Sequence, residues 1–218
     1  MFRAARVLVT VRIVVLRGCR ARGGGEERTM TVEPVVGPPG DLDSLIELLY
    51  GITPEGYKSE VVGGAVHMWP QTNTSWDITA DVLFQLTHRF GEVSDLWHDV
   101  RLDLPGHHNA FAPDLFKLSG TAGRDTQGRH RYQDVEFVLE VISRETAGSD
   151  YGAKKAAYAA GAVPVYLIAD PCTARWHLFT LPRNGEYRSR LSLDFGEPVD
   201  LTDTVLGMTL ATDRFPRD

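Results

Sequence analysis

Glu140 lies in the middle of an otherwise apolar run, residues 137–142. Because an ionised carboxylate in apolar surroundings is costly unless a cation or a hydrogen-bond donor meets it, this residue requires a partner. Two other residues could complete a site: Asp114, which follows Pro113 in a second short apolar stretch, and Lys154, which opens an alanine-rich segment. Two inward-facing carboxylates on neighbouring strands, with an ammonium group from the next helix, would form a compact site for a hard divalent cation.

The spacing of apolar residues indicates the elements that would position this site. Apolar residues at helical spacing predict helices, and runs or alternations of apolar residues predict strands. Strands and helices mixed in this way predict an α/β fold, with a central mixed β-sheet flanked by helices. The expected helices cover 42–49, 75–90 and 150–160, and the expected strands cover 59–62, 65–68, 94–104, 112–118, 135–143, 164–169, 176–181 and 186–191.

Length and composition favour a single domain. A chain of 218 residues that is 43% hydrophobic and 24% charged can bury one sizeable core. We expect this domain to cover residues 42–218 and to follow a proline-rich linker over residues 30–41. The two cysteines, Cys19 and Cys172, are too few for a disulfide framework and lack the spacing of a zinc site. Their use favours a reducing compartment, and we expect the cytoplasm.

Residues 1–29 differ in charge from the rest of the chain. They contain seven arginines and two glutamates, so the remainder is more acidic than the net charge of −6 suggests. An acidic body excludes a protein that coats nucleic acid through many lysine and arginine contacts with phosphates. The apolar run over residues 7–16 is too short to span a bilayer, so we expect no membrane contact. Our hypothesis is that translation starts at Met30 and that residues 1–29 are a non-native or disordered extension.

The three candidate residues belong to a longer series of motifs. The residues of this series are Glu60, Gly63, Gly64, Pro113, Asp114, Leu139, Glu140, Val141, Ile142, Ser143, Thr146, Asp150, Gly152, Lys154, Tyr158, Gly161, Val163, Tyr166, Asp170 and Pro171. In order and in spacing the series resembles the Uma-two family of endonucleases within the PD-(D/E)XK nuclease superfamily, over most of residues 45–205. The resemblance implies a restriction-endonuclease-like core with the active site at a splayed pair of strands.

The resemblance implies a role for each candidate residue. Asp114, Glu140 and the backbone carbonyl of Val141 would bind Mg²⁺, with Mn²⁺ as an alternative. Lys154 would orient or help deprotonate the attacking water and stabilise the charge that develops on the phosphate. Glu60 would act as an outer ligand through water. The implied activity is that of an endonuclease that hydrolyses phosphodiester bonds in DNA and works as a homodimer, because two copies are needed to cut both strands.

The sequence departs from the family pattern at three places. The lysine that the superfamily usually carries two residues beyond the second acid is replaced by Ile142, so that Lys154 is the matching residue and Lys155 the fallback. Trp76 occupies the place where many relatives carry a histidine, which puts an auxiliary catalytic group in doubt. Residues 144–145 are arginine and glutamate in place of the usual serine or proline after the strand serine, which affects substrate contacts more than chemistry.

Simpler readings of the same residues stay open at this point. Glu140 could be a structural carboxylate paired with Arg101 or Arg131, and Lys154 and Glu60 could be solvated surface residues. A non-enzymatic nucleic-acid- or protein-binding module on the same fold, or a hydrolase of a smaller phosphoester, would also fit the sequence. Two clusters are ambiguous: His98, His107 and His108 favour a polar loop over a zinc site, and Arg124, Arg129, His130 and Arg131 could contact phosphates.

Overall fold

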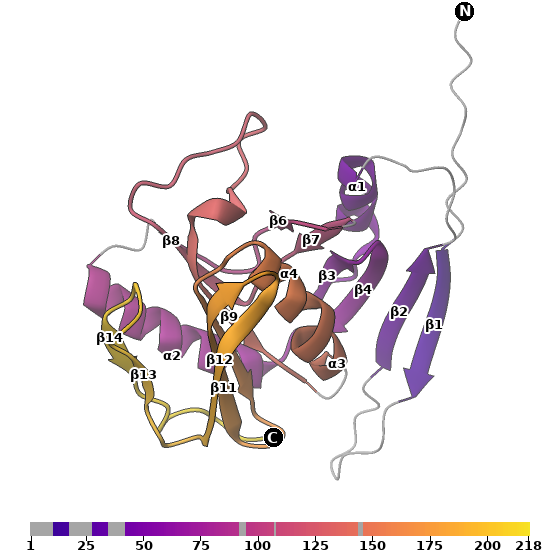
Figure 1. Cartoon of the computed structure of the whole chain (residues 1–218). Helices are drawn as coiled ribbons and strands as arrows, with labels where there is room; N and C mark the ends of the chain where they lie inside the picture. Colours follow the sequence, from indigo (N-terminus) through magenta and orange to yellow (C-terminus); the bar gives the residue numbers. More distant parts are fainter. Residues whose placement is uncertain (1–10, 18–27, 35–41, 92–94, 107, 144–145) are drawn as a thin grey trace, which may run out of the picture.

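The computed structural model describes residues 11–17, 28–34, 42–91, 95–106, 108–143 and 146–218. Most of these residues form two six-stranded sheets and the helices that pack on them (Figure 1). The expected α/β fold with a central mixed sheet is therefore confirmed. Within the described ranges, no helix is long and apolar enough to cross a membrane.

The central sheet has the strand order β12-β11-β10-β9-β8-β5. Strands β9 and β10 run parallel, and every other neighbouring pair in this sheet is antiparallel. The sheet is thus mixed, with its parallel pair at the centre. The strands are β5 (Leu96–Trp97), β8 (Leu115–Leu118), β9 (Val135–Val141), β10 (Val165–Asp170), β11 (Arg175–Arg183) and β12 (Glu186–Asp194).

Helices cover both faces of this sheet (Figure 1). Helix α2 (Asn73–Phe90) packs its buried residues in one core cluster with Phe137 and Leu139 of β9. The alternate residue Val138 belongs to the opposite cluster, with Tyr158 of the last helix. Because side chains alternate across a strand, Glu140 lies on the same face as Val138 and points toward that last helix. The helical segment on that face consists of α3 (Ala147–Ser149), η2 (Asp150–Lys154) and α4 (Lys155–Ala160).

The second sheet has the strand order β1-β2-β4-β3-β7-β6 and packs against helix α1 (Leu42–Ile52). Its β3–β4 hairpin turns at Gly63 and Gly64, both with positive φ, as the sequence predicts. The strands are β1 (Val11–Arg17), β2 (Arg28–Pro34), β3 (Tyr57–Val62), β4 (Ala65–Pro70), β6 (Leu102–Leu104) and β7 (Asn109–Phe111). A short helix η1 (Tyr132–Asp134) and a small sheet of β13 (Val199–Leu201) and β14 (Met208–Leu210) complete the elements.

Two expectations about strands and linkers differ from the structure. The single strand expected over 94–104 is divided into β5 and β6, because Asp99 between them adopts a positive φ of 51° that an extended strand does not contain. The expected linker over 30–41 and extension over 1–29 are partly sheet, since β2 pairs with β1 on one side and with β4 on the other. The apolar run over residues 7–16 is also typical of a strand, so β1 agrees with its residue pattern.

Asp43 in the first turn of α1 gives a testable prediction about stability. Its Oδ1 accepts hydrogen bonds from Arg101 and Arg129, each 2.6 Å away, and these arginines lower the pKa of Asp43. A lowered pKa means that the stabilisation is present above the ordinary pKa of an aspartate and is lost as the pH falls through the lowered value. We expect Asp43→Asn to cost roughly 0.5–1 kcal/mol at pH 7, because the side chain is 33% exposed. Urea unfolding should show parent and variant converging in acid; a difference that persists there would contradict this account.

Candidate active site

The site begins where strand β8 separates from β9. The backbone pairing of the two strands ends at Leu115, which lies opposite Leu139. At Asp114, the residue before Leu115, the contact with β9 is made by the side chain. Its Oδ2 accepts a 2.7 Å hydrogen bond from the amide of Val141. In an extended strand the N–H and C=O of one residue point to the same edge, so the Val141 carbonyl also faces this opening. The splayed pair thus presents a carboxylate and a backbone carbonyl beside Glu140.

Lys154 lies at the centre of the acidic residues. Its Nζ is 2.6 Å from Glu140 Oε1, 3.0 Å from Glu60 Oε2 and 3.0 Å from Asp150 Oδ1, and the residue is only 2% exposed. These four residues come from β3, β9 and the helical segment that follows β9. The structure therefore brings together Glu60, Glu140 and Lys154, which the sequence singled out from three different elements.

A π-helical turn directs Lys154 inward. The turn is η2, in which Asp150 and Lys154 are both 2% exposed. Single π-turns inside α-helices often occur at functional sites, because the wider turn changes the direction of the side chains that follow. The fallback residue, Lys155, instead places its Nζ 5.2 Å from the ring centroid of Phe179. Of the two adjacent lysines, Lys154 is the one that contacts the acids.

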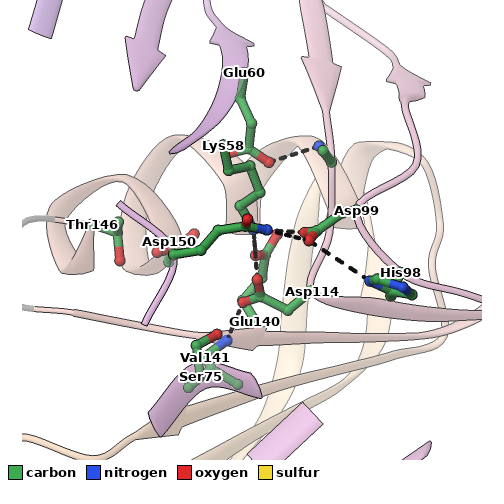
Figure 2. A network of polar contacts seen from close by, with 12 residues as sticks. Lys58, Glu60, Ser75, His98, Asp99, Asp114, Glu140, Val141, Thr146 and Asp150 are labelled. Carbon is green, nitrogen blue, oxygen red and sulfur yellow. Dashed lines mark hydrogen bonds and ion pairs between the residues drawn. The ribbon is translucent and has the colours of Figure 1, made fainter. Parts of the chain in front are cut away.

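A second lysine, which the sequence analysis did not select, joins the acids from β3. Lys58 Nζ lies 2.6 Å from Asp114 Oδ1, 3.7 Å from Asp99 Oδ1 and 4.0 Å from Glu140 Oε2 (Figure 2). Its position two residues before Glu60 was the available signal, because residues i and i+2 of a strand share a face. The site therefore contains two ammonium groups, one on each side of Glu140.

Two further hydrogen bonds hold the glutamates in place. Tyr158 donates its hydroxyl to Glu140 Oε1 at 2.6 Å, and the Ala112 amide donates to Glu60 Oε1 at 2.7 Å. Both glutamates are buried, so these donors and Lys154 replace the water that the carboxylates lose. The result is a rigid arrangement in which the Oε2 atom of Glu140 is the oxygen directed toward Lys58.

Burial and mutual charge shift the pKa values of the site. Burial raises the pKa of Glu140 to about 8, against the opposing effect of the Lys154 and Lys58 ammonium groups. Burial alone would lower the pKa of Lys154, but the carboxylates of Asp150, Glu140 and Glu60 outweigh it and raise that pKa well above its ordinary value. Lys154 is therefore protonated, and a divalent cation that binds Glu140 would favour its ionised form and lower its raised pKa.

A cleft lined by these residues provides the oxygen ligands that a hard cation prefers. Asp114, Glu140 and Val141 all line it, and two carboxylates plus a carbonyl, completed by water, are a usual ligand set for Mg²⁺. Within the described parts of the chain, no three histidine, cysteine, aspartate or glutamate side chains are grouped as a metal site. A cation here would thus depend on the backbone carbonyl and on water as well as on the two acids, and the donor set fits Mg²⁺.

Neither Arg101 nor Arg131 is the partner of Glu140. Arg101 pairs with Asp43 and Asp103, and Arg131 lies 3.6 Å from Asp134. The reading of Glu140 as the partner of one of these arginines is therefore wrong, since the counter-ion is Lys154. The reading of Lys154 as a solvated lysine is also wrong, because it is buried.

The basic loop between the two acidic motifs uses its charges internally. Arg129 forms ion pairs with Asp43, Asp103 and Asp125. His130 is buried, with its ring centroid 4.3 Å from that of Trp97. Because of these contacts, the loop offers fewer unpaired positive charges to a phosphate than its sequence suggests.

Two ring side chains lie at the cleft on the side of helix α2. Trp76 is 51% exposed, and its ring centroid is 5.6 Å from that of His98. His98 Nδ1 is 3.7 Å from Asp99 Oδ2. The histidine that many relatives carry at the position of Trp76 is thus absent, but His98 lies beside that position. His107, which the sequence analysis grouped with His98 and His108, falls outside the described residues.

A mixed sheet with a splayed strand pair that carries an acid on each strand, followed by a helix that adds a lysine, defines a restriction-endonuclease-like fold. The model of the Uma2 family, described as "Putative restriction endonuclease", matches residues 43–213, and the chain belongs to this family. The chain is similar in fold to a protein from Anabaena variabilis ATCC 29413, whose crystal structure is titled "a putative nuclease belonging to DUF820". The TM-score is 0.62 at 13% sequence identity, over 81% of this chain and 97% of that chain. No curated protein matches the chain.

Proposed function

We propose that this protein is a Mg²⁺-dependent endonuclease that hydrolyses phosphodiester bonds in DNA. The observation that carries the proposal is the buried ammonium of Lys154, 2.6 Å from Glu140 at the splayed end of β9, with Asp114 held beside it by the Val141 amide. Burying a lysine among acids is expensive, and an arrangement of this kind is typical of a catalytic site. Membership of a family described as restriction endonucleases supports the same reaction class.

The chemistry assigned to each residue follows from its charge and position. Asp114, Glu140 and the Val141 carbonyl would hold Mg²⁺, or Mn²⁺ in its place. When bound, the ion supplies Lewis acidity to the phosphate and lowers the pKa of a bound water. Lys154, whose pKa is raised, would donate hydrogen bonds to the attacking water and to the developing negative charge, rather than accept a proton. Glu60 would fix Lys154 and serve as an outer ligand through water.

A hydrolase of a smaller phosphoester is the second candidate. It is favoured by the internal pairing of Arg129 and Arg131, which removes charge that a long DNA backbone would otherwise contact. This function would use the same acids and lysine but no extended groove. An inactive binding module on the same fold would retain the scaffold without turnover. The homodimer and the cytoplasmic location stay predictions from the sequence.

Plasmid nicking tests the proposed function. Supercoiled DNA with Mg²⁺ or Mn²⁺ should be nicked by the parent protein, and Glu140→Gln and Lys154→Ala should each lower the rate by roughly 100-fold or more. Equal traces of nicking in all three proteins would indicate a contaminant and would contradict the proposal. Hydrolysis of a small phosphodiester without DNA cleavage would favour the second candidate.

A further inference from the structure

Lys58 occupies the place where the free oxygens of the two acids converge. Asp114 Oδ2 accepts the Val141 amide, and Glu140 Oε1 accepts Tyr158 and contacts Lys154. The other oxygen of each acid, Asp114 Oδ1 and Glu140 Oε2, is directed at the Lys58 ammonium at 2.6 and 4.0 Å. A cation shared by both acids would need these same two atoms. Lys58 therefore holds the position that a metal ion would require.

An alternative acceptor for Lys58 lies on its other side. Asp99 Oδ1 is buried, makes no hydrogen bond, and is 3.7 Å from the Lys58 Nζ. The carboxylate is held by Gln71, which donates to Asp99 Oδ2 at 2.6 Å, so the free oxygen is fixed in place. A small movement of the lysine side chain would transfer its ammonium from Asp114 to Asp99 without exposing a charge.

We propose that Lys58 is a resident counter-ion of the metal site, which leaves Asp114 for Asp99 when a divalent cation binds Asp114 and Glu140. This inference rests on the proposed function, because it assumes that these two acids hold the cation. An ammonium in hydrogen-bond contact with Asp114 Oδ1 and a divalent ion on the same oxygen would repel each other at close range, where water does not screen them. Lys58 thus sets the metal affinity of the free protein and is a positioning residue.

A counter-ion such as Lys58 is useful here because the site contains more acidic than basic side chains. Without metal, Glu140 and Asp114 would repel each other whenever both are ionised, and the Lys58 ammonium offsets this repulsion. With metal, the ammonium is no longer needed between the acids but retains Asp99 as a partner. The Lys58 ammonium thus has a carboxylate partner in both states.

Direct binding of Mn²⁺, measured by calorimetry or by electron paramagnetic resonance without DNA, tests this inference. We expect Lys58→Met to tighten binding by about tenfold or more, because the competing ammonium is gone. We expect Asp99→Asn to weaken binding by about fivefold, because the displaced lysine loses its acceptor. In the Lys58→Met background, Asp99→Asn should change the Mn²⁺ affinity much less than it does in the parent protein. If the two residues acted independently through long-range charge, their effects on the binding free energy would simply add.

Controls separate failure of this inference from failure of the proposed function. Lys155→Met removes the neighbouring lysine that does not contact the acids, and should leave Mn²⁺ affinity unchanged. Glu140→Gln should abolish binding; if the parent protein binds no Mn²⁺, or if Glu140→Gln binds it equally well, both proposals fail. If Glu140→Gln abolishes binding but Lys58→Met binds no more tightly than the parent, the counter-ion role alone is overturned. If thermal unfolding shows that Lys58→Met does not fold, the Asp99→Asn variant alone decides. Equal Mn²⁺ affinities of Asp99→Asn and the parent protein would then overturn the counter-ion role.

Discussion

Replacing Lys154 with methionine should destabilise the protein by about 3–5 kcal/mol at neutral pH. The substitution preserves side-chain volume but leaves the carboxylates of Glu60, Glu140 and Asp150 buried without the ammonium that contacts all three. Burial raises the pKa values of Glu140 and Asp150, so the loss should grow as the pH rises above their unfolded values of about 4 and shrink in acid. Urea unfolding at several pH values measures this effect.

The adjacent lysine provides the matched control for this prediction. Lys155→Met makes the same chemical change one residue later, where the ammonium lies over Phe179 and contacts no acid of the site. We expect it to cost less than about 1 kcal/mol. Adding Glu60→Gln to Lys154→Met should recover part of the lost stability, because one unpaired charge is removed. A loss below about 1 kcal/mol for Lys154→Met would show that the ammonium does not compensate these acids.

Replacing Asp114 with asparagine should lower the nicking rate by roughly 100-fold or more while leaving the fold intact. The side-chain oxygen of asparagine can still accept the Val141 amide, so the link between β8 and β9 is preserved. The negative charge that would hold the metal is lost. Gel assays of plasmid nicking, with thermal unfolding of the same samples, measure the two effects separately.

Asp134 is a suitable comparison for Asp114. It is also a partly buried aspartate whose Oδ2 accepts a backbone amide, from Gly123 at 3.1 Å, but it does not line the cleft. Asp134→Asn should nick DNA at the parental rate. If Asp114→Asn also retained the parental rate, Asp114 would have no part in catalysis, and the assignment of the metal site would have to be abandoned.

Part of the site could be predicted because its residues conflict with their surroundings. A glutamate in an apolar strand, such as Glu140, signals a partner, and the order of motifs pointed to Lys154. Lys58 gave no comparable signal, because Tyr57 and Ser59 beside it are typical of a half-exposed strand, in which a lysine is ordinary. Its one signal was its place two residues before Glu60, because its contacts with Asp114 and Asp99 join residues far apart in the sequence.

The fold was predictable where elements are long and periodic. Helix α2 begins two residues before its expected start and ends at Phe90, before Gly91, as expected. Strand β7 was missed because three residues carry no periodic signal. The strand expected over 94–104 was wrong because its apolar spacing continues through Asp99, and an aspartate can adopt the left-handed conformation without a distinctive neighbour.

The contact between Lys154 and Glu60 spans 94 positions, and that between Lys58 and Asp114 spans 56. During synthesis, a chain that has left the ribosome only as far as β9 already contains every acid assigned to the metal but not the lysine of the helix after it. Under the proposed function, DNA cleavage would then require that translation has passed that helix.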